Sequence, residues 1–336
     1  MNNTETLVRV ENLRVHFPGR RKSLFGRRPI VQAVDDVSFN IPRGRTLGLV
    51  GESGCGKSTT GLALMRLIQP TDGRVLFDDA DLTNLQGEAL RQMRRRIQIT
   101  FQDPYSALNP RMTAGDIISE PLRVLGLGTA EQRESRVSEL LAKVGLSAEH
   151  RDLYPHQFSG GQRQRIGIAR ALAPAPDLII CDEPVSALDV AIQAQILNIL
   201  IRLQREMGLT FLFISHDLAV VQHISHEVIV MYLGQIVEQA DRSALFLAPK
   251  HPYTRALLSS VPSRNPDDRG GATRLRLEGD LPSPSDPPSG CRFRTRCPYA
   301  EARCAAEPPK LRAIAGSRRI ACHFVSDGGD APWLND

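Results

Sequence analysis

The segment Gly51–Thr59, GESGCGKST, constrains the fold more than any other part of the chain. It matches G-x-x-x-x-G-K-[ST], the pattern of a phosphate-binding loop. The apolar run Thr46–Val50 before it predicts a buried strand, and the apolar spacing in Thr60–Ile68 after it predicts a helix. Strand, loop and helix in this order are the context in which the motif binds a triphosphate. A glycine-rich turn without a ligand is the alternative, and the complete match in this context makes it the weaker interpretation.

The chemistry of this loop follows from its residue types. Glycines let the backbone bend so that successive N–H groups point inward, and the N-terminus of the following helix adds a positive dipole end. Lys57 would supply a charge for the β- and γ-phosphates, and the Ser58 hydroxyl would ligate Mg²⁺. The residues expected to contact the nucleotide are those of the whole loop: Gly51, Glu52, Ser53, Gly54, Cys55, Gly56, Lys57, Ser58 and Thr59.

A second apolar run, Leu178–Glu183, ends in two carboxylates. This pattern predicts a central parallel strand that is buried on both faces and delivers its acids to the carboxyl edge of the sheet. We expect Asp182 to hold Mg²⁺, directly or through water, and Glu183 to polarise the attacking water as a general base. Gln102 and His216 also follow strand-like runs, but neither is a strong signal alone.

A second anion-binding element begins at Phe158 with the sequence FSGGQ. Ser159 is a good N-cap, the glycines permit close backbone approach, and the helix N-terminus can receive an anion. One nucleotide does not need both this helix and the phosphate loop from the same subunit. The sequence therefore predicts a dimer in which the second subunit contributes Ser159, Gly160, Gly161 and Gln162 to each phosphate loop.

The octapeptide FSGGQRQR, starting at Phe158, resembles the signature motif of ABC-transporter ATPases. With the phosphate loop, the resemblance covers residues 1–245 as a nucleotide-binding domain. It implies an α/β P-loop NTPase of ABC type with a RecA-like core sheet, an antiparallel β subdomain and an inserted α-helical subdomain over residues 103–172. The substrate and metal that it implies are ATP and Mg²⁺.

The resemblance also gives roles to residues that are weak signals alone. It implies that Gln102 senses the γ-phosphate and Mg²⁺, and that His216 bonds the γ-phosphate. Asp189 would cap the next helix and touch the partner subunit. Phe17 aligns with the aromatic residue that stacks on adenine, with His16 as the weaker candidate and core packing of Phe17 as the alternative.

Composition limits the cellular setting. Charged residues at 24% and apolar residues at 41% are typical of a soluble globular protein, and the net charge of +5 does not require nucleic acid. Without a membrane-spanning run or a signal peptide, the chain is expected at the cytoplasmic face of the cell membrane as a peripheral protein. The basic stretch 19–29 is either a solvated hairpin tip or a contact for anionic lipid headgroups.

Residues 246–336 lie beyond the minimal ATPase. His251–Leu258 and Leu277–Pro284 resemble the extension of ATPase subunits from oligopeptide and dipeptide importers. The implied partners are two transmembrane permease subunits, a second identical or homologous ATPase subunit, and an extracytoplasmic peptide-binding protein. Two alternatives stay open: the same role for another solute such as nickel, and a soluble ABC ATPase. The soluble class carries coiled-coil arms or tandem cores, and neither is evident here.

The extension contains four cysteines, Cys291, Cys297, Cys304 and Cys322, spaced C-x5-C-x6-C-x17-C. Few apolar residues surround them, which predicts a small irregular lobe held together by something other than a core. A cytosolic compartment disfavours disulfides, and zinc usually needs a short C-x2–4-C pair. A [4Fe–4S] cluster tolerates wider spacing, so it is the expected cofactor, with zinc and free thiols as alternatives. Six arginines near these cysteines would offset the negative charge of such a site: Arg292, Arg294, Arg296, Arg303, Arg318 and Arg319.

Overall fold

A computed structural model of the chain describes residues 5–19, 28–103, 107–259 and 279–334. Most of the basic stretch (20–27) and the polar segment 265–271 lie outside these ranges. The chain divides into two compact units. The first unit comprises Met1–Arg9, Asn40–Thr46 and Leu76–Ser215, and the second comprises Val10–Phe39, Leu47–Val75 and His216–Asp336. The predicted boundaries at residues 103 and 172 delimit a helical subdomain, and the one at residue 245 ends the nucleotide-binding domain. The two compact units do not test these boundaries, which stay predictions.

The N-terminal strands form a four-stranded sheet in the order β2-β1-β4-β5. Its strands are β1 (Thr6–Pro18), β2 (Ile30–Pro42), β4 (Asp72–Phe77) and β5 (Ala80–Asp81). Strand β1 is continuous from Thr6 to Pro18. Asn12 adopts φ +48° in the middle of it, and the Asn12 N–H donates to Ser38 Oγ at 2.8 Å. Asparagine tolerates this conformation, so the strand continues through the irregularity.

The core of the first unit is a parallel sheet in the order β8-β7-β6. Its strands are β6 (Ile97–Thr100), β7 (Leu178–Asp182) and β8 (Thr210–Ile214). The register places Ile180 opposite Ile99 on one side and opposite Leu212 on the other. Both faces of β7 are buried, as predicted for a run without alternation. Helices α2 (Gly87–Arg96) and α7 (Val190–Met207) belong to the same unit.

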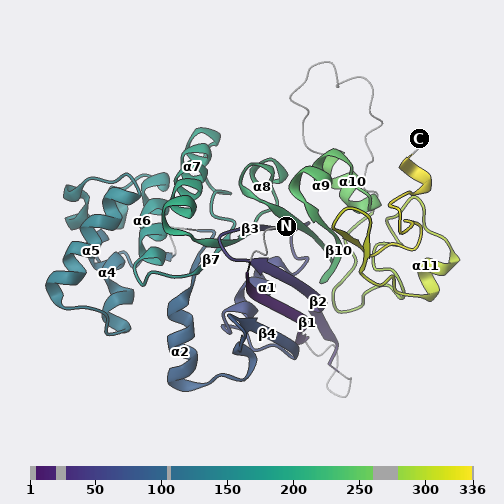
Figure 1. The fold of residues 1–336 in the computed structure, drawn as a ribbon, viewed down its shortest axis with the longest axis horizontal. Helices are drawn as coiled ribbons and strands as arrows, with labels where there is room; N and C mark the ends of the chain where they lie inside the picture. Colours follow the sequence, from purple (N-terminus) through teal and green to yellow (C-terminus); the bar gives the residue numbers. More distant parts are fainter. Residues whose placement is uncertain (1–4, 20–27, 104–106, 260–278, 335–336) are drawn as a thin grey trace. The chain divides into compact units, whose positions relative to one another are not determined.

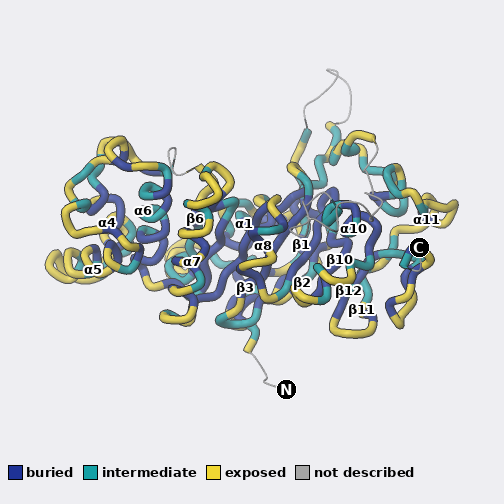
Figure 2. Tube along the Cα trace, turned by 90° about the horizontal axis from the view of Figure 1, so that it is seen from above, coloured by how far each residue is buried: buried dark blue, intermediate teal, exposed yellow. Residues whose placement is uncertain are grey.

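Three α-helices of the first unit lie among the described residues of the range 103–172, where the sequence predicts helices, and they contact one another (Figure 1). They are α4 (Ala114–Val124), α5 (Ala130–Lys143) and α6 (Gly160–Leu172). Thr113 caps α4 by accepting from the Asp116 N–H, and Thr129 and Gln132 form a capping box at α5. Figure 2 shows α5 largely exposed, with its buried side formed by Val137, Leu140 and Leu141.

The strands of the second unit run in the order β11-β12-β10-β9-β3. They are β3 (Thr46–Val50), β9 (Glu227–Tyr232), β10 (Gln235–Asp241), β11 (Arg312–Ile314) and β12 (Arg318–Ile320). The buried strand β3 pairs in parallel with β9, and β9 and β10 form an antiparallel hairpin. The helices of this unit are α1 (Lys57–Leu64), α8 (Leu218–Ile224), α9 (Arg242–Leu247), α10 (Pro252–Ser259) and α11 (Ala302–Ala306).

The C-terminal extension corrects one expectation, because it has a hydrophobic core of its own. The buried residues of this cluster are Ile314, Ile320, Val325, Ala331 and Trp333. The Trp333 ring stacks on Tyr299 with centroids 4.6 Å apart. Strand β12 also pairs antiparallel with β10, so the extension continues the sheet of its unit rather than forming a lobe without a core. These apolar residues are too widely spaced along the chain to produce a helical or strand periodicity. The core was therefore not predictable from the sequence pattern.

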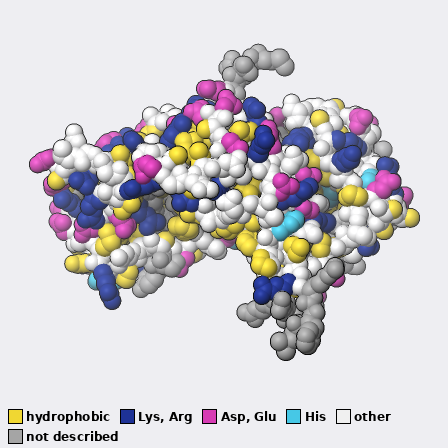
Figure 3. Space-filling view, turned by 90° about the horizontal axis from the view of Figure 1, so that it is seen from below, with side chains coloured by type: hydrophobic (Ala, Val, Ile, Leu, Met, Phe, Trp, Pro, Cys, Tyr) yellow, Lys and Arg dark blue, Asp and Glu magenta, His cyan; other side chains and the backbone are white. Residues whose placement is uncertain are grey.

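The surface carries charges of both signs. Lys and Arg side chains are interspersed with Asp and Glu over the face drawn in Figure 3, as expected from 42 basic and 37 acidic residues. In the described ranges, none of the helices combines the length and the apolar character needed to cross a bilayer.

Candidate functional site

The phosphate-binding loop lies between β3 and α1 in the second unit, and two of its glycines are sterically required. Gly51 and Gly56 have φ +152° and +106°. A Cβ at Gly51 would lie 2.2 Å from Met231 O, and one at Gly56 would lie 2.2 Å from Ala33 O. No side chain fits at either position, so the backbone alone forms this part of the loop. The loop therefore has the open, backbone-lined form that a triphosphate needs.

Lys57 begins α1, and its side chain folds back over the loop. The residue is 5% exposed. Its ammonium group donates to Gly51 O at 2.8 Å and to Glu52 O at 3.0 Å. The cation is thus held inside the loop by carbonyl oxygens, within the concavity where phosphate oxygens would be bound. Ser58, the next residue of the helix, is exposed and is the candidate Mg²⁺ ligand of this loop.

The candidate acid and base lie in the first unit at the carboxyl end of β7. Asp182 is the last residue of the strand, and Glu183 follows it with φ +47°. The Glu183 N–H donates to Ile214 O at 2.9 Å, which fixes this unusual conformation. The Gln102 amide donates to Glu183 Oε2 at 2.9 Å. The structure therefore brings together Gln102 and Glu183, which are far apart in the sequence.

The signature segment opens α6, also in the first unit. Ser159 Oγ accepts from the Gln162 N–H at 3.3 Å, while Gln162 Oε1 accepts from the Ser159 N–H at 2.9 Å. This capping box leaves Ser159 exposed at the helix N-terminus. A Cβ on Gly161 would lie 2.5 Å from Ile192 Cγ2, so a glycine is needed for α6 to approach α7. The predicted N-cap is confirmed.

The three remaining candidates are exposed. Asp189 caps α7 by accepting from the Ile192 N–H at 3.0 Å, which confirms its predicted capping role. His216 is exposed just before α8 in the second unit. Phe17, near the end of β1, is 37% exposed, which does not support the alternative of core packing. His16, the weaker candidate, lies with Nε2 3.3 Å from Asp35 Oδ1 and is therefore already engaged.

The cysteines of the extension give a second correction. Within the described residues, which include all four, no group of three or more His, Cys, Asp or Glu side chains is arranged to hold a metal ion. Burial raises the pKa of Cys291 to about 11 and that of Cys297 to about 12. All four, including Cys304 and Cys322, are free thiols. The predicted [4Fe–4S] cluster is wrong, and the alternative of zinc gains no support.

The arginines near these cysteines have other partners than a cluster. Arg292 pairs with Asp35, Arg296 with Glu52 and Arg318 with Glu238. Sequence reasoning missed these ion pairs, because each joins residues that are widely separated along the chain. The sequence showed only that arginines are numerous near the cysteines. We expected them to offset the negative charge of a metal site, whereas their partners are carboxylates.

A phosphate loop, a strand ending in two acids and a capped helix opening with two glycines define a P-loop ATPase. Residues 34–186 match the family described as ABC transporter, and residues 237–304 match the oligopeptide/dipeptide transporter C-terminal region. The chain is 54% identical over 320 residues to y4tS of Sinorhizobium fredii, a probable peptide ABC transporter ATP-binding protein, covering 95% of this chain and 90% of the relative. It is 52% identical over 326 residues to the oligopeptide transport ATP-binding protein AppF of Bacillus subtilis, covering 96% and 99%.

Solved structures agree with this assignment. The ATP-binding cassette MJ0796, in a dimeric post-hydrolysis state with ADP and Pi, is 31% identical at a TM-score of 0.62 and covers 70% of this chain and 98% of its own. The cbiO1 protein of Clostridium perfringens is 27% identical at a TM-score of 0.63, covering 73% and 92%. The chain belongs to the ABC transporter family, among the ATP-binding subunits with the oligopeptide/dipeptide C-terminal region. It is accordingly an ATPase coupled to transport, and its substrate is ATP with Mg²⁺.

Proposed function

We propose that this ATPase energises the uptake of di- and oligopeptides from the cytoplasmic face of the cell membrane. The observation that carries the peptide assignment is the match of residues 237–304 to the oligopeptide/dipeptide transporter C-terminal region. The names of the relatives support the same solute class, since they are peptide and oligopeptide transport proteins. Neither of these two relatives is named for nickel, the other solute that the extension left open.

Each residue of the nucleotide site has a proposed role. Lys57 binds the β- and γ-phosphates, and Ser58, Gln102 and Asp182 hold Mg²⁺, which neutralises charge on the phosphates when it is bound. Glu183 accepts a proton from the attacking water. The Gln102 amide, 2.9 Å from Glu183 Oε2, supports this role because it orients the carboxylate. His216 contacts the γ-phosphate, and Phe17 stacks on the adenine.

The signature helix is proposed to act on a nucleotide bound by a second ATPase subunit. The exposed Ser159 at a capped helix N-terminus supports this arrangement, because such a terminus receives anions. ATP binding would close the pair of ATPases, and hydrolysis with phosphate release would reopen it. This cycle would drive two membrane permease subunits, with peptide delivered by an extracytoplasmic binding protein. In this proposal residues 1–245 form the nucleotide-binding domain and residues 246–336 the extension.

The test is reconstitution of the complete transporter. The chain is expressed with the permease subunits, the second ATPase and the binding protein encoded beside it, and ATP hydrolysis is measured in liposomes. We expect the subunits to purify together and peptide-loaded binding protein to stimulate hydrolysis. An active ATPase that never associates with membrane subunits would contradict the transport role. Stimulation by Ni²⁺ and not by peptides would contradict the solute assignment.

A further inference from the structure

The carboxylate of Glu52, the second residue of the phosphate loop, is held by an arginine of the C-terminal extension. Arg296 Nη1 donates to Glu52 Oε2 at 2.6 Å, and Arg296 Nη2 donates to Glu52 Oε1 at 3.0 Å. The two side chains are 7% and 25% exposed. A bidentate pair between a guanidinium and a carboxylate is both strong and directional, so it fixes the orientation of the glutamate. Both residues belong to the second unit.

A second contact from the extension holds the backbone of the same residue. The Glu52 N–H donates to Tyr253 Oη at 2.9 Å. Tyr253 lies in α10 and is fully buried. Its ring packs at 4.7 Å from that of Tyr232 and at 5.4 Å from that of Phe293. Because aromatic neighbours fix the ring, the position of the hydroxyl is set by packing and not by the loop.

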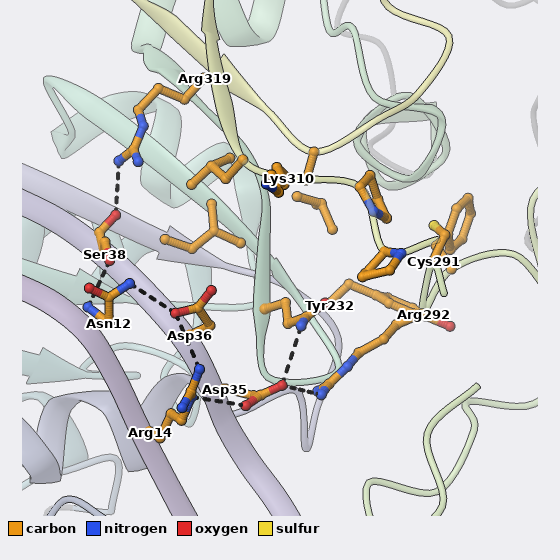
Figure 4. Close-up of a pocket in the computed structure, with 18 residues that line it drawn as sticks. Asn12, Arg14, Asp35, Asp36, Ser38, Tyr232, Cys291, Arg292, Lys310 and Arg319 are labelled. Atoms are coloured by element: carbon orange, nitrogen blue, oxygen red, sulfur yellow. Dashed lines mark hydrogen bonds and ion pairs between the residues drawn. The ribbon is translucent and has the colours of Figure 1, made fainter. Parts of the chain in front are cut away.

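The extension that supplies these contacts is anchored to the rest of its unit by two further buried arginines. Arg318 donates to Glu238 at 2.6 Å, and the two side chains are 6% and 0% exposed. Arg292 donates to Asp35 and to Leu233 O, and Figure 4 shows its guanidinium reaching the Asp35 carboxylate. Arg296 therefore projects from a segment whose place is already fixed on both sides.

The pocket of about 510 Å³ in Figure 4 lies beside this junction. Several of its charged groups are paired with one another: Asp35 accepts from Arg292 and lies 3.6 Å from Arg14, while Arg319 donates to Ser38 O at 2.9 Å. The contacts of Arg292 and Arg319 tie the extension to β2, so the pocket lies within the anchoring network.

Electrostatics give the contact with Glu52 a function. An anionic side chain in a loop that binds a triphosphate would repel the ligand, and the effect would be largest where the loop excludes water. Arg296 compensates the Glu52 charge and fixes the carboxylate. The Glu52 carbonyl in turn accepts from Lys57 Nζ at 3.0 Å, so the residue that the extension holds also contacts the lysine of the loop.

We propose that Arg296 and Tyr253 are positioning residues for ATP, and that the C-terminal extension is thereby part of the nucleotide site. This inference rests on the proposed role of the loop in ATP binding. The extension served above to classify the transporter, and the inference now gives it a role in ATP binding.

The test is ATPase kinetics of the full chain in the assembled complex, with Arg296→Gln, Arg296→Lys and Tyr253→Phe. A hydrogen bond to a charged group is lost in Arg296→Gln, so we expect KM for ATP to rise by about 10- to 100-fold, with a smaller change in kcat. Arg296→Lys keeps the positive charge but loses the two-pronged hydrogen bond of the guanidinium. Its KM for ATP should therefore lie between the values for Arg296→Gln and wild type. Tyr253→Phe keeps the buried ring and should raise KM by a smaller factor. Arg303→Gln is the matched control, because Arg303 belongs to the same extension and its side chain is 60% exposed. The KM of this variant for ATP should equal that of wild type.

Rescue separates the proposed role from a loss of folding. In Glu52→Gln/Arg296→Gln the repelling charge is gone, and we expect most of the ATP affinity to return. Failure of this rescue, or a KM within twofold of wild type for Arg296→Gln, would overturn the inference while leaving the proposed function intact. Wild-type protein without ATP turnover in the complex would overturn both.

Discussion

At the scale of single residues, the surroundings of a side chain decide whether it is exposed for a ligand or already contacts another residue of the protein. Phe17 and His16 are neighbours on β1, and both are aromatic. The ring of Phe17 is partly exposed, whereas His16 lies beside Asp35. The sequence analysis ranked Phe17 above His16, but it could not show that His16 contacts Asp35, because that contact joins two strands.

The first prediction follows from this difference. Stacking of a base on an aromatic side chain contributes about 1–3 kcal/mol, so Phe17→Ala should weaken ATP binding by roughly 5- to 150-fold. Phe17→Trp should retain the affinity, and His16→Ala should leave it within about twofold. Fluorescence titration with a labelled ATP measures all three. If His16→Ala weakens binding more than Phe17→Ala, the adenine platform has been assigned to the wrong residue.

At the scale of elements, apolar patterns predicted the strands and helices that frame the site. The runs Thr46–Val50 and Leu178–Glu183 predicted buried strands, and β3 and β7 are found there. Ser159 predicted the start of α6, because an N-cap is a local signal. The close approach of α6 to α7 was not predictable, since it depends on Ile192 meeting Gly161 across two helices.

Two glycines of α6 give a matched prediction. Gly161→Ala places a Cβ 2.5 Å from Ile192 Cγ2 and should lower the free energy of unfolding by about 1–3 kcal/mol. A Cβ at Gly167 meets nothing within 4 Å, so Gly167→Ala should raise it by about 0.5–1 kcal/mol. Urea denaturation of both variants measures the difference. Equal effects of the two substitutions would show that α6 does not pack on α7 as described.

At the scale of the whole molecule, the described part of the extension is held by buried polar contacts and a hydrophobic core. The cysteine spacing was the strongest local feature of this segment, and it led to the wrong prediction. The features that stabilise the extension are non-local: Trp333 packs on Tyr299, and three arginines reach carboxylates elsewhere in the unit. A sequence shows such residues but not their partners, which is why the P-loop was predictable and the extension was not.

The Arg318–Glu238 pair tests how firmly the extension is held. Removing one member leaves the other charge buried and unpaired, so Arg318→Met should lower the free energy of unfolding by about 3–5 kcal/mol. Arg303→Met, at an exposed pair with Glu307, should change it by less than about 0.5 kcal/mol. Denaturant titrations give both values. A small effect of Arg318→Met would mean that this pair does not anchor the extension.

Histidine 251 makes stability depend on pH. His251 is buried, and its Nδ1 accepts from the Tyr253 N–H at 3.1 Å. Burial lowers the pKa of His251 from 6.5 to about 3, so the folded protein keeps it neutral. The unfolded chain binds the proton below about pH 6.5, so this contribution to stability is complete above that pH and declines toward pH 3, by up to about 1.4 kcal/mol per pH unit.

Melting temperatures of wild type and His251→Asn across pH 7 to 5 measure this contribution. We expect the variant to be less stable at pH 7 but to lose less stability on acidification. His156→Asn, at an exposed position, serves as the control, and its melting temperature should vary with pH as that of wild type does. Parallel curves for wild type and His251→Asn would contradict the buried neutral state.

The most direct test of the whole account is ATP turnover by Glu183→Gln in the assembled ATPase pair, measured together with its affinity for ATP. We expect ATP to bind with a Kd within a few-fold of wild type, because Glu183 lies outside the phosphate loop. Hydrolysis should fall by about 10²- to 10⁴-fold, the usual contribution of a general base. Turnover at the wild-type rate in this variant would contradict the role of Glu183 and, with it, the proposed mechanism.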